Sequence, residues 1–467
     1  MLIQFTVENH LSFRDKAVLS LRAPAGASEH DSPAYIRVGD EVLLRATVFY
    51  GANASGKSNL VRALQYAIKL ILDGTTGKRG IARHPFKLTT EARRAPSQFE
   101  LSFLHKAEGE DAYTQFHYGF AIDDERVFGE WLYRGPESTE ELLFERSWSE
   151  QDEAHEFVLG DFIQDPKQRQ FYEFLHQGTR VNQLFLSEAE SKNAPAFDAP
   201  LSWLRKQVVI IAPDAKFQQL VAHVHGDEDF RIALTGLMSR ADTGIRRLHT
   251  VSQALPDLPD EIKDMVNRLA AHNEVLFEEG GAGMVLAAAG GYEHISLRTQ
   301  RARDDGSAVD FTLDEESDGT LRFMHLAPIL CPWTDEPGLV HIADELERSL
   351  HPLLTREFMR MFIDAGDELP HQLLCTTHDT NLLDCGMLEP ASIWFVERDA
   401  HGGSHIYSLH DFDADQIQAL RADDKLESGY LQGRFGAIPF LGDKRRLVAS
   451  KLADELLRSA RHVTPGA

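Results

Sequence analysis

The sequence predicts an α/β fold, in which a parallel-sheet core is interrupted by an antiparallel β lobe and a helical insertion. Three observations predict it. A glycine-rich loop at residues 51–58 stands between an apolar strand and a helix. An apolar strand that ends in an acidic pair follows only at residues 338–345. Between the two, the spacing of apolar residues changes from alternation, which is typical of strands, to the longer period of helices, so the core must be split in sequence.

The loop at residues 51–58 reads GANASGKS and matches the phosphate-binding pattern GxxxxGK[ST]. Residues 46–50 form a short apolar run, and residues 59–68 have helical spacing, so the loop has the strand–turn–helix context that this motif requires. Backbone N–H groups and the helix N-terminus would wrap the phosphates of a nucleoside triphosphate. Lys57 would reach the β- and γ-phosphates, and Ser58 would ligate Mg²⁺. The predicted nucleotide-binding residues are Asn53, Ala54, Ser55, Gly56, Lys57, Ser58 and Asn59.

The second half of an ATPase site is predicted at residues 338–345, which read GLVHIADE. Asp344 would hold Mg²⁺, and Glu345 would activate or orient the attacking water. An ordinary strand with an exposed acidic end would look the same. The next strand, at residues 372–377, is followed by His378, and ligands of open α/β sheets gather at such strand ends. We therefore expect His378 to sense the γ-phosphate, with a purely structural histidine as the alternative.

The chain divides into four predicted segments. Alternating apolar and polar residues indicate the antiparallel lobe, and an amphipathic run at residues 260–269 is typical of the helical insertion. The segments are the first part of the core with the phosphate loop at 1–97, the β lobe at 98–163, the mainly helical insertion at 164–283, and the second part of the core at 284–467.

The sequence predicts that the chain returns to the core where the insertion ends. The glycine-rich stretch at residues 280–283 marks the point of return. Residues 284–440 are predicted to alternate strands and helices as in a parallel sheet, and residues 443–460 to form the last helix.

Composition limits the class of protein. The 467 residues are 43% hydrophobic, but no apolar run reaches the length of a membrane span, and the start does not read as a signal peptide. Three scattered cysteines, Cys331, Cys375 and Cys385, provide neither a disulfide framework nor a zinc site. We therefore expect a cytoplasmic protein without a membrane partner. With 48 basic and 73 acidic residues, the formal charge of −25 disfavours broad nonspecific DNA binding but leaves room for a local basic groove.

Residues 317–320 read Ser-Asp-Gly-Thr and precede an apolar helix. Ser317 is either a plain helix cap or part of an element that resembles the signature of ABC-type ATPases. In that class, Ser317 and Gly319 would bind the γ-phosphate held by the loop of another protomer. The order of phosphate loop, insertion, signature, acidic strand and histidine is the ABC order. The transporter-like signature Ser-Gly-Gly-Gln is absent, and Gln98 is a weak candidate for the glutamine of a Q-loop.

Together these elements resemble the AbiL/RloA-type ATP-binding proteins of bacterial phage defence, relatives of the OLD and RecF/Rad50-like ATPases. The resemblance implies an ABC-type P-loop ATPase core that uses ATP and Mg²⁺, and a homo-oligomer with ATP sites between protomers. It also implies a separate, nuclease-like effector and a phage protein or DNA as trigger. Residues 349–352 would be the D-loop that touches the opposite protomer. The residues that carry the resemblance are 4–13, 49–59, 84–88, 316–320, 343–352 and 430–439.

Two other functions compete with this one. A self-contained nuclease of the OLD type would need a further domain, but too little chain follows Glu397, and we interpret residues 411–415 as an acidic turn and not as a metal cluster. A RecF-like DNA-repair ATPase would need a basic groove. Its compact candidates, Arg298, Arg301 and Arg303, stand beside two aspartates.

Overall fold

The computed structural model describes residues 1–439 except 76, 78–79, 108, 111, 256–258, 271–274, 279–281, 289–290, 332–337 and 423–424. The last predicted helix, at 443–460, and Gly280 and Gly281 of the predicted return lie outside the described residues. No helix in the described part of the chain combines the length and the apolar character that crossing a bilayer requires.

The core is a six-stranded sheet in the order β11-β17-β18-β5-β19-β20. Its first five strands are parallel, and β20 pairs antiparallel with β19. The strand β18 lies between β5, which leads into the phosphate loop, and β17, which ends in the acidic pair, so all three C-terminal ends meet at one edge. The strands are β5 (Ala46–Tyr50), β11 (Val208–Ile211), β17 (Val340–Ala343), β18 (Gln372–Thr376), β19 (Ile393–Arg398) and β20 (Ser404–Ser408).

Helices cover both faces of this sheet because successive strand residues point to opposite sides. On β18, Leu374 packs into a core with the helix α1 (Lys57–Asp73), whereas Leu373 and Cys375 pack into a second core with α9 (Asp318–Leu326) and α10 (Pro352–Asp364). Burial of both faces explains why these strands read as continuous apolar runs.

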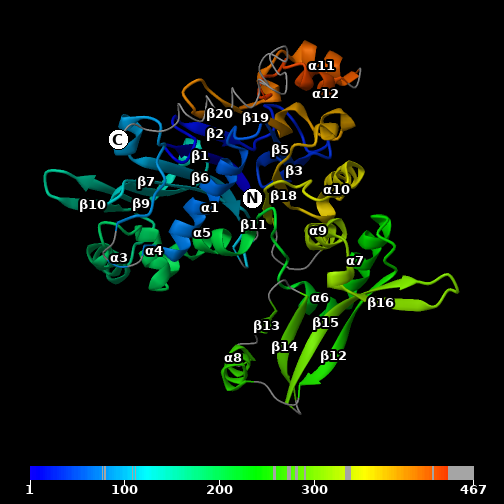
Figure 1. The fold of residues 1–467 in the computed structure, drawn as a ribbon. Coiled ribbons are helices and arrows are strands. Elements are labelled where there is room, and N and C mark those ends of the chain that lie inside the picture. Colours follow the sequence, from blue (N-terminus) through cyan, green and yellow to red (C-terminus); the bar gives the residue numbers. More distant parts are fainter. Residues whose placement is uncertain are drawn as a thin grey trace, which may run out of the picture.

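The predicted antiparallel lobe is confirmed, and it recruits the N-terminal strands as well. Seven antiparallel strands follow the order β10-β9-β8-β7-β6-β1-β2, and α1 lies between this lobe and the core sheet (Figure 1). The strands are β1 (Leu2–Glu8), β2 (Ala17–Ser20), β6 (Ser97–His105), β7 (Thr114–Ile122), β8 (Val127–Arg134), β9 (Glu141–Ser149) and β10 (Ala154–Leu159); a small hairpin, β3 (Tyr35–Val38) with β4 (Glu41–Leu44), and the helix α2 (Thr90–Arg94) accompany them.

Residues 164–283 contain mainly helices, as predicted, but one strand of this range, β11, belongs to the core sheet. The helices are α3 (Pro166–Gly178), α4 (Phe185–Ser191), α5 (Asp198–Ser202), α6 (Leu220–Gly226), α7 (Glu228–Arg240) and α8 (Asp260–Ala270).

The prediction for residues 284–312 was wrong. Instead of a parallel α/β arrangement, β14 (Gly283–Ala288), β15 (Gly291–Ala302) and β16 (Ala308–Thr312) form an antiparallel sheet with β12 (Arg247–Leu255) and β13 (Leu276–Phe277). In β15 the buried residues alternate with half-buried polar ones, which is the period of a sheet with one covered face. This sheet and α8 lie apart from the core sheet (Figure 1), and the chain returns to the core only at α9.

Candidate nucleotide-binding site

The phosphate loop connects β5 to α1 and depends on backbone conformations that favour glycine. Gly56, at the N-cap of α1, has φ +116°, and a Cβ there would come within 2.3 Å of the Ser404 hydroxyl. The loop therefore requires glycine at this position both for its conformation and for the close approach of Ser404.

Residues far apart in sequence brace the loop from behind. The Ser404 hydroxyl lies 2.6 Å from the carbonyl of Ser55 and 2.7 Å from the Ser12 hydroxyl. The Asn59 amide donates to the same Ser12 oxygen at 2.8 Å. Asn59 was predicted to bind nucleotide. It borders the cavity, but its side-chain amide is hydrogen-bonded to Ser12, which supports the loop.

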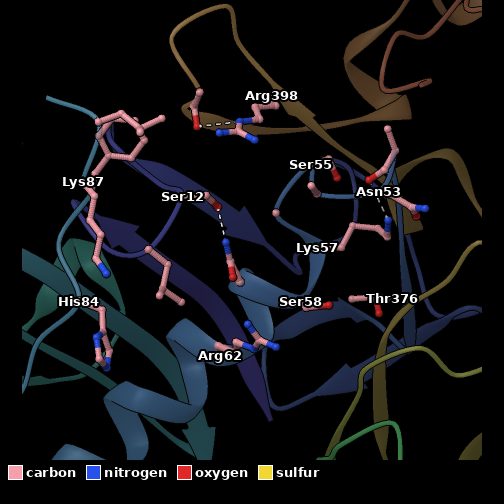
Figure 2. A pocket seen from close by; sticks show the side chains of 18 of the residues that line it. Ser12, Asn53, Ser55, Lys57, Ser58, Arg62, His84, Lys87, Thr376 and Arg398 are labelled. Carbon is pink, nitrogen blue, oxygen red and sulfur yellow. Dashed lines mark hydrogen bonds between the residues drawn. The ribbon is translucent and has the colours of Figure 1, made fainter. Parts of the chain in front are cut away.

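A cavity of about 780 Å³ opens in front of the loop. All seven predicted loop residues line it, and so do Glu345 and His378 from the edge of the core sheet. Basic side chains to which the sequence assigned no role also line it, on α1, on the segment before α2 and on β19; they are Arg62, Lys87 and Arg398, and His84 lies beside Lys87 on the same segment (Figure 2). A concave site with excess positive charge suits a polyphosphate ligand.

Ser58 lines this cavity and contacts Asp344, which is buried behind it. The Ser58 hydroxyl donates to Oδ1 of Asp344 at 3.0 Å, and Thr376 Oγ1 donates to the same oxygen at 2.6 Å. Mg²⁺ in nucleotide sites binds one or two carboxylate or hydroxyl oxygens together with substrate phosphates, so this donor pair fits the ion. No group of three or more acidic, histidine or cysteine side chains that could hold a metal without nucleotide occurs among the described residues.

Lys57 points back into its own loop. Its ammonium donates to the carbonyls of Gly51 at 2.7 Å and Ala52 at 3.3 Å. Burial lowers its pKa to about 8, and the carboxylates of Glu347, Asp344 and Glu345, in that order, oppose the shift. A bound phosphate would replace these carbonyls as the partner of the ammonium.

Glu345 and His378 leave neighbouring strands at the same edge, as the sequence predicted. Glu345 adopts φ +51°, and its N–H donates to Thr376 Oγ1 at 2.8 Å. His378 is exposed and borders the cavity; burial of part of its ring, and then the charge of Lys57, lower its pKa. The left-handed turn at Glu345 directs the chain away from the sheet directly after Asp344.

The signature candidate stands apart from the cavity of its own chain. Ser317 is the N-cap of α9, accepts from the Thr320 N–H at 3.2 Å and is exposed, and neither it nor Gly319 lines the cavity. A Cβ on Gly319 would come within 2.7 Å of the carbonyl oxygen of Ser349, so the start of α9 packs against the predicted D-loop. The helix-cap interpretation is therefore correct as local geometry.

Other sequence candidates do not contribute to the cavity. The Gln98 amide donates to Glu100 on its own strand at 2.5 Å, and Gln98 does not border the cavity. Arg301 makes two bonds to Glu316, at 2.7 and 2.6 Å, which neutralises the centre of the proposed basic groove. Residues 411–415 form a capped turn and the start of α11 (Ala414–Ala422).

The block at residues 430–439 closes the core and does not line the cavity. Tyr430, on α12 (Leu426–Leu431), stacks on Phe395 of β19 and donates to the carbonyl of Ala437 at 3.1 Å. Thr376 and Glu347 contact the acidic edge, but neither was assigned a role from the sequence, because their contacts to Asp344 and His378 cross between neighbouring strands.

Comparison with known proteins adds a family. A sequence model described as "AAA domain, putative AbiEii toxin, Type IV TA system" matches residues 46–384. No curated protein matches the chain.

Solved structures that are similar include three heads of SMC proteins, and all three likenesses are distant. The SMC head domain from Thermotoga maritima is 12% identical, with 87% of this chain and 98% of that chain covered and a TM-score of 0.38. The Smc head bound to the C-winged helix domain of ScpA is 11% identical, with 89% and 99% covered and a TM-score of 0.44. The Smc head with an extended coiled coil, bound to a ScpA domain derived from Pyrococcus furiosus, is 10% identical, with 90% and 98% covered and a TM-score of 0.37.

Proposed function

The chain belongs to the AbiEii-type AAA-domain family, and from this premise we propose that it binds ATP with Mg²⁺ and hydrolyses it. The observation that carries the proposal is the contact between Ser58 and Asp344, because it joins the phosphate loop to the acidic strand end in the arrangement that holds Mg²⁺ beside a β,γ-phosphate.

Each residue at this edge has a role that follows from its position. The loop N–H groups and Lys57 hold the phosphates, and Ser58 and Asp344 hold Mg²⁺, which neutralises charge that develops on the phosphate oxygens. Glu345 borders the cavity one residue beyond Asp344, where its carboxylate orients the attacking water and accepts its proton. His378 donates to the γ-phosphate from the neighbouring strand end.

The test separates binding from turnover. Lys57→Ala should abolish ATP binding, because it removes the charge that faces the phosphates, whereas Glu345→Gln should bind ATP normally and turn it over at least about a hundredfold more slowly. Glu357→Gln on α10 is the matched control, because Glu357 pairs with Arg240 and Arg360 and does not border the cavity, and this variant should behave as the unchanged protein. Normal hydrolysis by Glu345→Gln would overturn the assignment of the base.

We further propose that the working ATP site is shared between two copies of the chain. Ser317 is exposed and Gly319 is half-buried at the start of α9, and neither borders the cavity of its own chain, so a second protomer would have to supply them. Backbone N–H groups at a helix N-terminus are suited to a terminal phosphate.

The wider role that we propose is a sensor ATPase of an anti-phage system in the cytoplasm, which controls a separate nuclease-like effector and responds to a phage protein or DNA. The family description, which pairs the AAA domain with a toxin system, supports this role. Inspection of the neighbouring genes tests it, because a replication or repair neighbour would favour the RecF-like alternative.

A further inference from the structure

Glu347 holds a central position at the acidic edge that the roles above do not use. Its Oε1 accepts from the backbone N–H of His378 at 2.7 Å. Its Oε2 is buried and has no hydrogen-bond partner among the described residues. One carboxylate oxygen of Glu347 is therefore hydrogen-bonded to the backbone of His378, and the other has no hydrogen-bond partner among the described residues.

Arg322 on α9 is a buried side chain of the opposite charge. It lies in the second turn of α9, only 7% exposed, and donates from Nη1 to the carbonyl of Ala212 at 3.3 Å. Its Nε and Nη2 are buried without a hydrogen-bond partner in the described part of the chain. Burial, and then the charge of Arg348, lower the pKa of its guanidinium, and the carboxylates of Asp214, Glu347 and Glu345, in that order, oppose the shift.

Arg322 and Glu347 carry opposite charges at the same edge of the sheet. The carbonyl of Ala212, which Arg322 contacts, follows that of Ile211, which accepts from the N–H of Asp344 at 2.9 Å. No ion pair within 4.0 Å joins Arg322 and Glu347 in the described structure. Glu347 Oε2 and the Nε and Nη2 atoms of Arg322 are nevertheless buried without hydrogen-bond partners there. Leaving such atoms unpaired costs free energy, so a small movement that brings them together is favourable. The same two segments already touch where Gly319 meets the carbonyl of Ser349.

We propose that Glu347 and Arg322 are positioning residues that close into an ion pair when nucleotide occupies the phosphate loop, and so tie the γ-phosphate end of the site to the signature helix α9 of the same chain. Lys57 initiates the closure, because it leaves the carbonyls of Gly51 and Ala52 for the phosphates. Glu347 then turns Oε2 to the guanidinium, and α9 is held in the orientation that presents Ser317 to a second protomer. This inference rests on the proposed ATPase function.

A double-mutant cycle on Glu347→Gln and Arg322→Gln tests the pair. Each single variant should lower kcat about tenfold and change KM by less than about threefold, and the double variant should be no slower than the slower single variant, since residues that act as a unit are not additive. The exposed pair Glu357 and Arg360 on α10 is the matched control, and its Gln variants should leave kcat and KM unchanged. Thermal melting of each variant checks its folding.

The outcomes separate the pair from the function on which it rests. An unchanged protein that neither binds nor hydrolyses ATP would overturn the ATPase itself. If the unchanged protein hydrolyses ATP and the two tenfold losses of kcat multiply to about a hundredfold in the double variant, the two residues act independently and only the proposed pair is overturned. If Arg322→Gln does not fold, the cycle is run with Arg322→Lys, and a structure with a non-hydrolysable ATP analogue gives an independent answer. Glu347 Oε2 within about 3.5 Å of the guanidinium is expected, and continued separation would refute the closure.

Discussion

Ser58 and Asp344 are 286 positions apart in the chain, yet the hydroxyl of one donates to the carboxylate of the other at 3.0 Å. Thr376, at the end of β18, donates from its hydroxyl to the same carboxylate oxygen at 2.6 Å. The strand order explains the meeting, because β18 lies between β5 and β17 and all three end at one edge. The Mg²⁺ ligands that we propose are therefore oriented by the fold before any nucleotide arrives.

The first prediction concerns this metal site. Asp344→Asn should abolish Mg²⁺-dependent hydrolysis, because the amide is a much weaker ligand. Thr376→Ala should keep activity but need about 10- to 100-fold more Mg²⁺, as expected when a side chain that orients a ligand is removed. Hydrolysis rates measured across a Mg²⁺ titration check both. Equal Mg²⁺ requirements for Thr376→Ala and the unchanged protein would show that Thr376 does not orient Asp344.

The second prediction concerns the shared site. Lys57→Ala and Ser317→Arg should each be inactive alone, but a mixture should recover part of the hydrolysis, because one class of mixed site then combines an intact loop with an intact signature. With random pairing in an equimolar mixture, recovery should approach about a quarter of the normal rate per site. Subunit exchange is shown separately with labelled protein. Exchange without any recovery would contradict a composite site.

The local parts of the site could be predicted because their signal is contiguous. The phosphate loop needs glycine, lysine and serine at fixed spacing, and its flanks read as a strand and a helix. Asp344 and Glu345 followed from an apolar strand with an acidic end. The antiparallel lobe followed from alternation, although the sequence could not show that β1 would join it.

The parts that failed depend on pairing partners that a single sequence does not reveal. β15 alternates clearly, but nothing in its own residues says whether its neighbours are parallel or antiparallel, and β12 and β14 decide that. The support of the phosphate loop by Ser12 and Ser404 joins residues 392 positions apart. Glu347 acquires its contact to His378 only because the chain turns after Asp344, at the positive φ of Glu345.

The third prediction concerns the buried pair Glu130 and Arg146, which are both fully buried and lie 3.8 Å apart. Glu130 also accepts from the N–H groups of Phe185 and Leu186 at 2.6 and 2.9 Å, so it ties the lobe to α4. Arg146→Met should lower the free energy of unfolding by about 3–5 kcal/mol, because it leaves a buried carboxylate unpaired.

The matched control is the surface pair Arg134 and Glu141, which are 41% and 44% exposed. Arg134→Met should cost less than about 1 kcal/mol. Chemical denaturation monitored by circular dichroism measures both variants. Equal losses would show that the buried pair has no special role in holding the lobe to α4.

The fourth prediction is a loss of stability in mild acid. Burial lowers the pKa of several histidines to about 3 or 4 in the folded chain, so the unfolded chain, with a pKa near 6.5, binds protons more tightly. Stability is therefore complete above about pH 6.5 and falls as the pH drops toward 4. The loss is up to about 1.4 kcal/mol per pH unit for each fully buried histidine and smaller for His155 and His176, which are half-buried and screened by solvent. The histidines are His10, His155, His176, His325, His341 and His371.

His10 offers the cleanest test of this acid sensitivity. Neither ring nitrogen has a hydrogen-bond partner in the described structure, and the ring packs against Tyr66 and Phe99. His10→Phe should keep the packing and reduce the slope of stability against pH between 6.5 and 4.5, whereas His30→Gln, at an exposed position, should leave it unchanged. Thermal melting at a series of pH values measures the slopes, and an unaltered slope for His10→Phe would exclude His10 as a contributor.

The last prediction concerns what the chain does without a partner. The purified protein should cut neither DNA nor RNA, because its acidic residues at the cavity serve a triphosphate and the acidic turn at residues 411–415 has its carboxylates engaged locally. There Asp411 accepts from the Ser408 N–H at 2.8 Å, and Asp413 accepts from the Gln416 N–H at 2.9 Å. The assay supplies Mg²⁺ or Mn²⁺ with and without ATP, and a known nuclease confirms that the substrates are cleavable. Robust cleavage that disappears in the double variant Asp411→Ala/Asp413→Ala would refute the separate effector and restore a self-contained nuclease. Cleavage that persists in this variant would refute the separate effector equally, and would require a catalytic centre elsewhere in the chain.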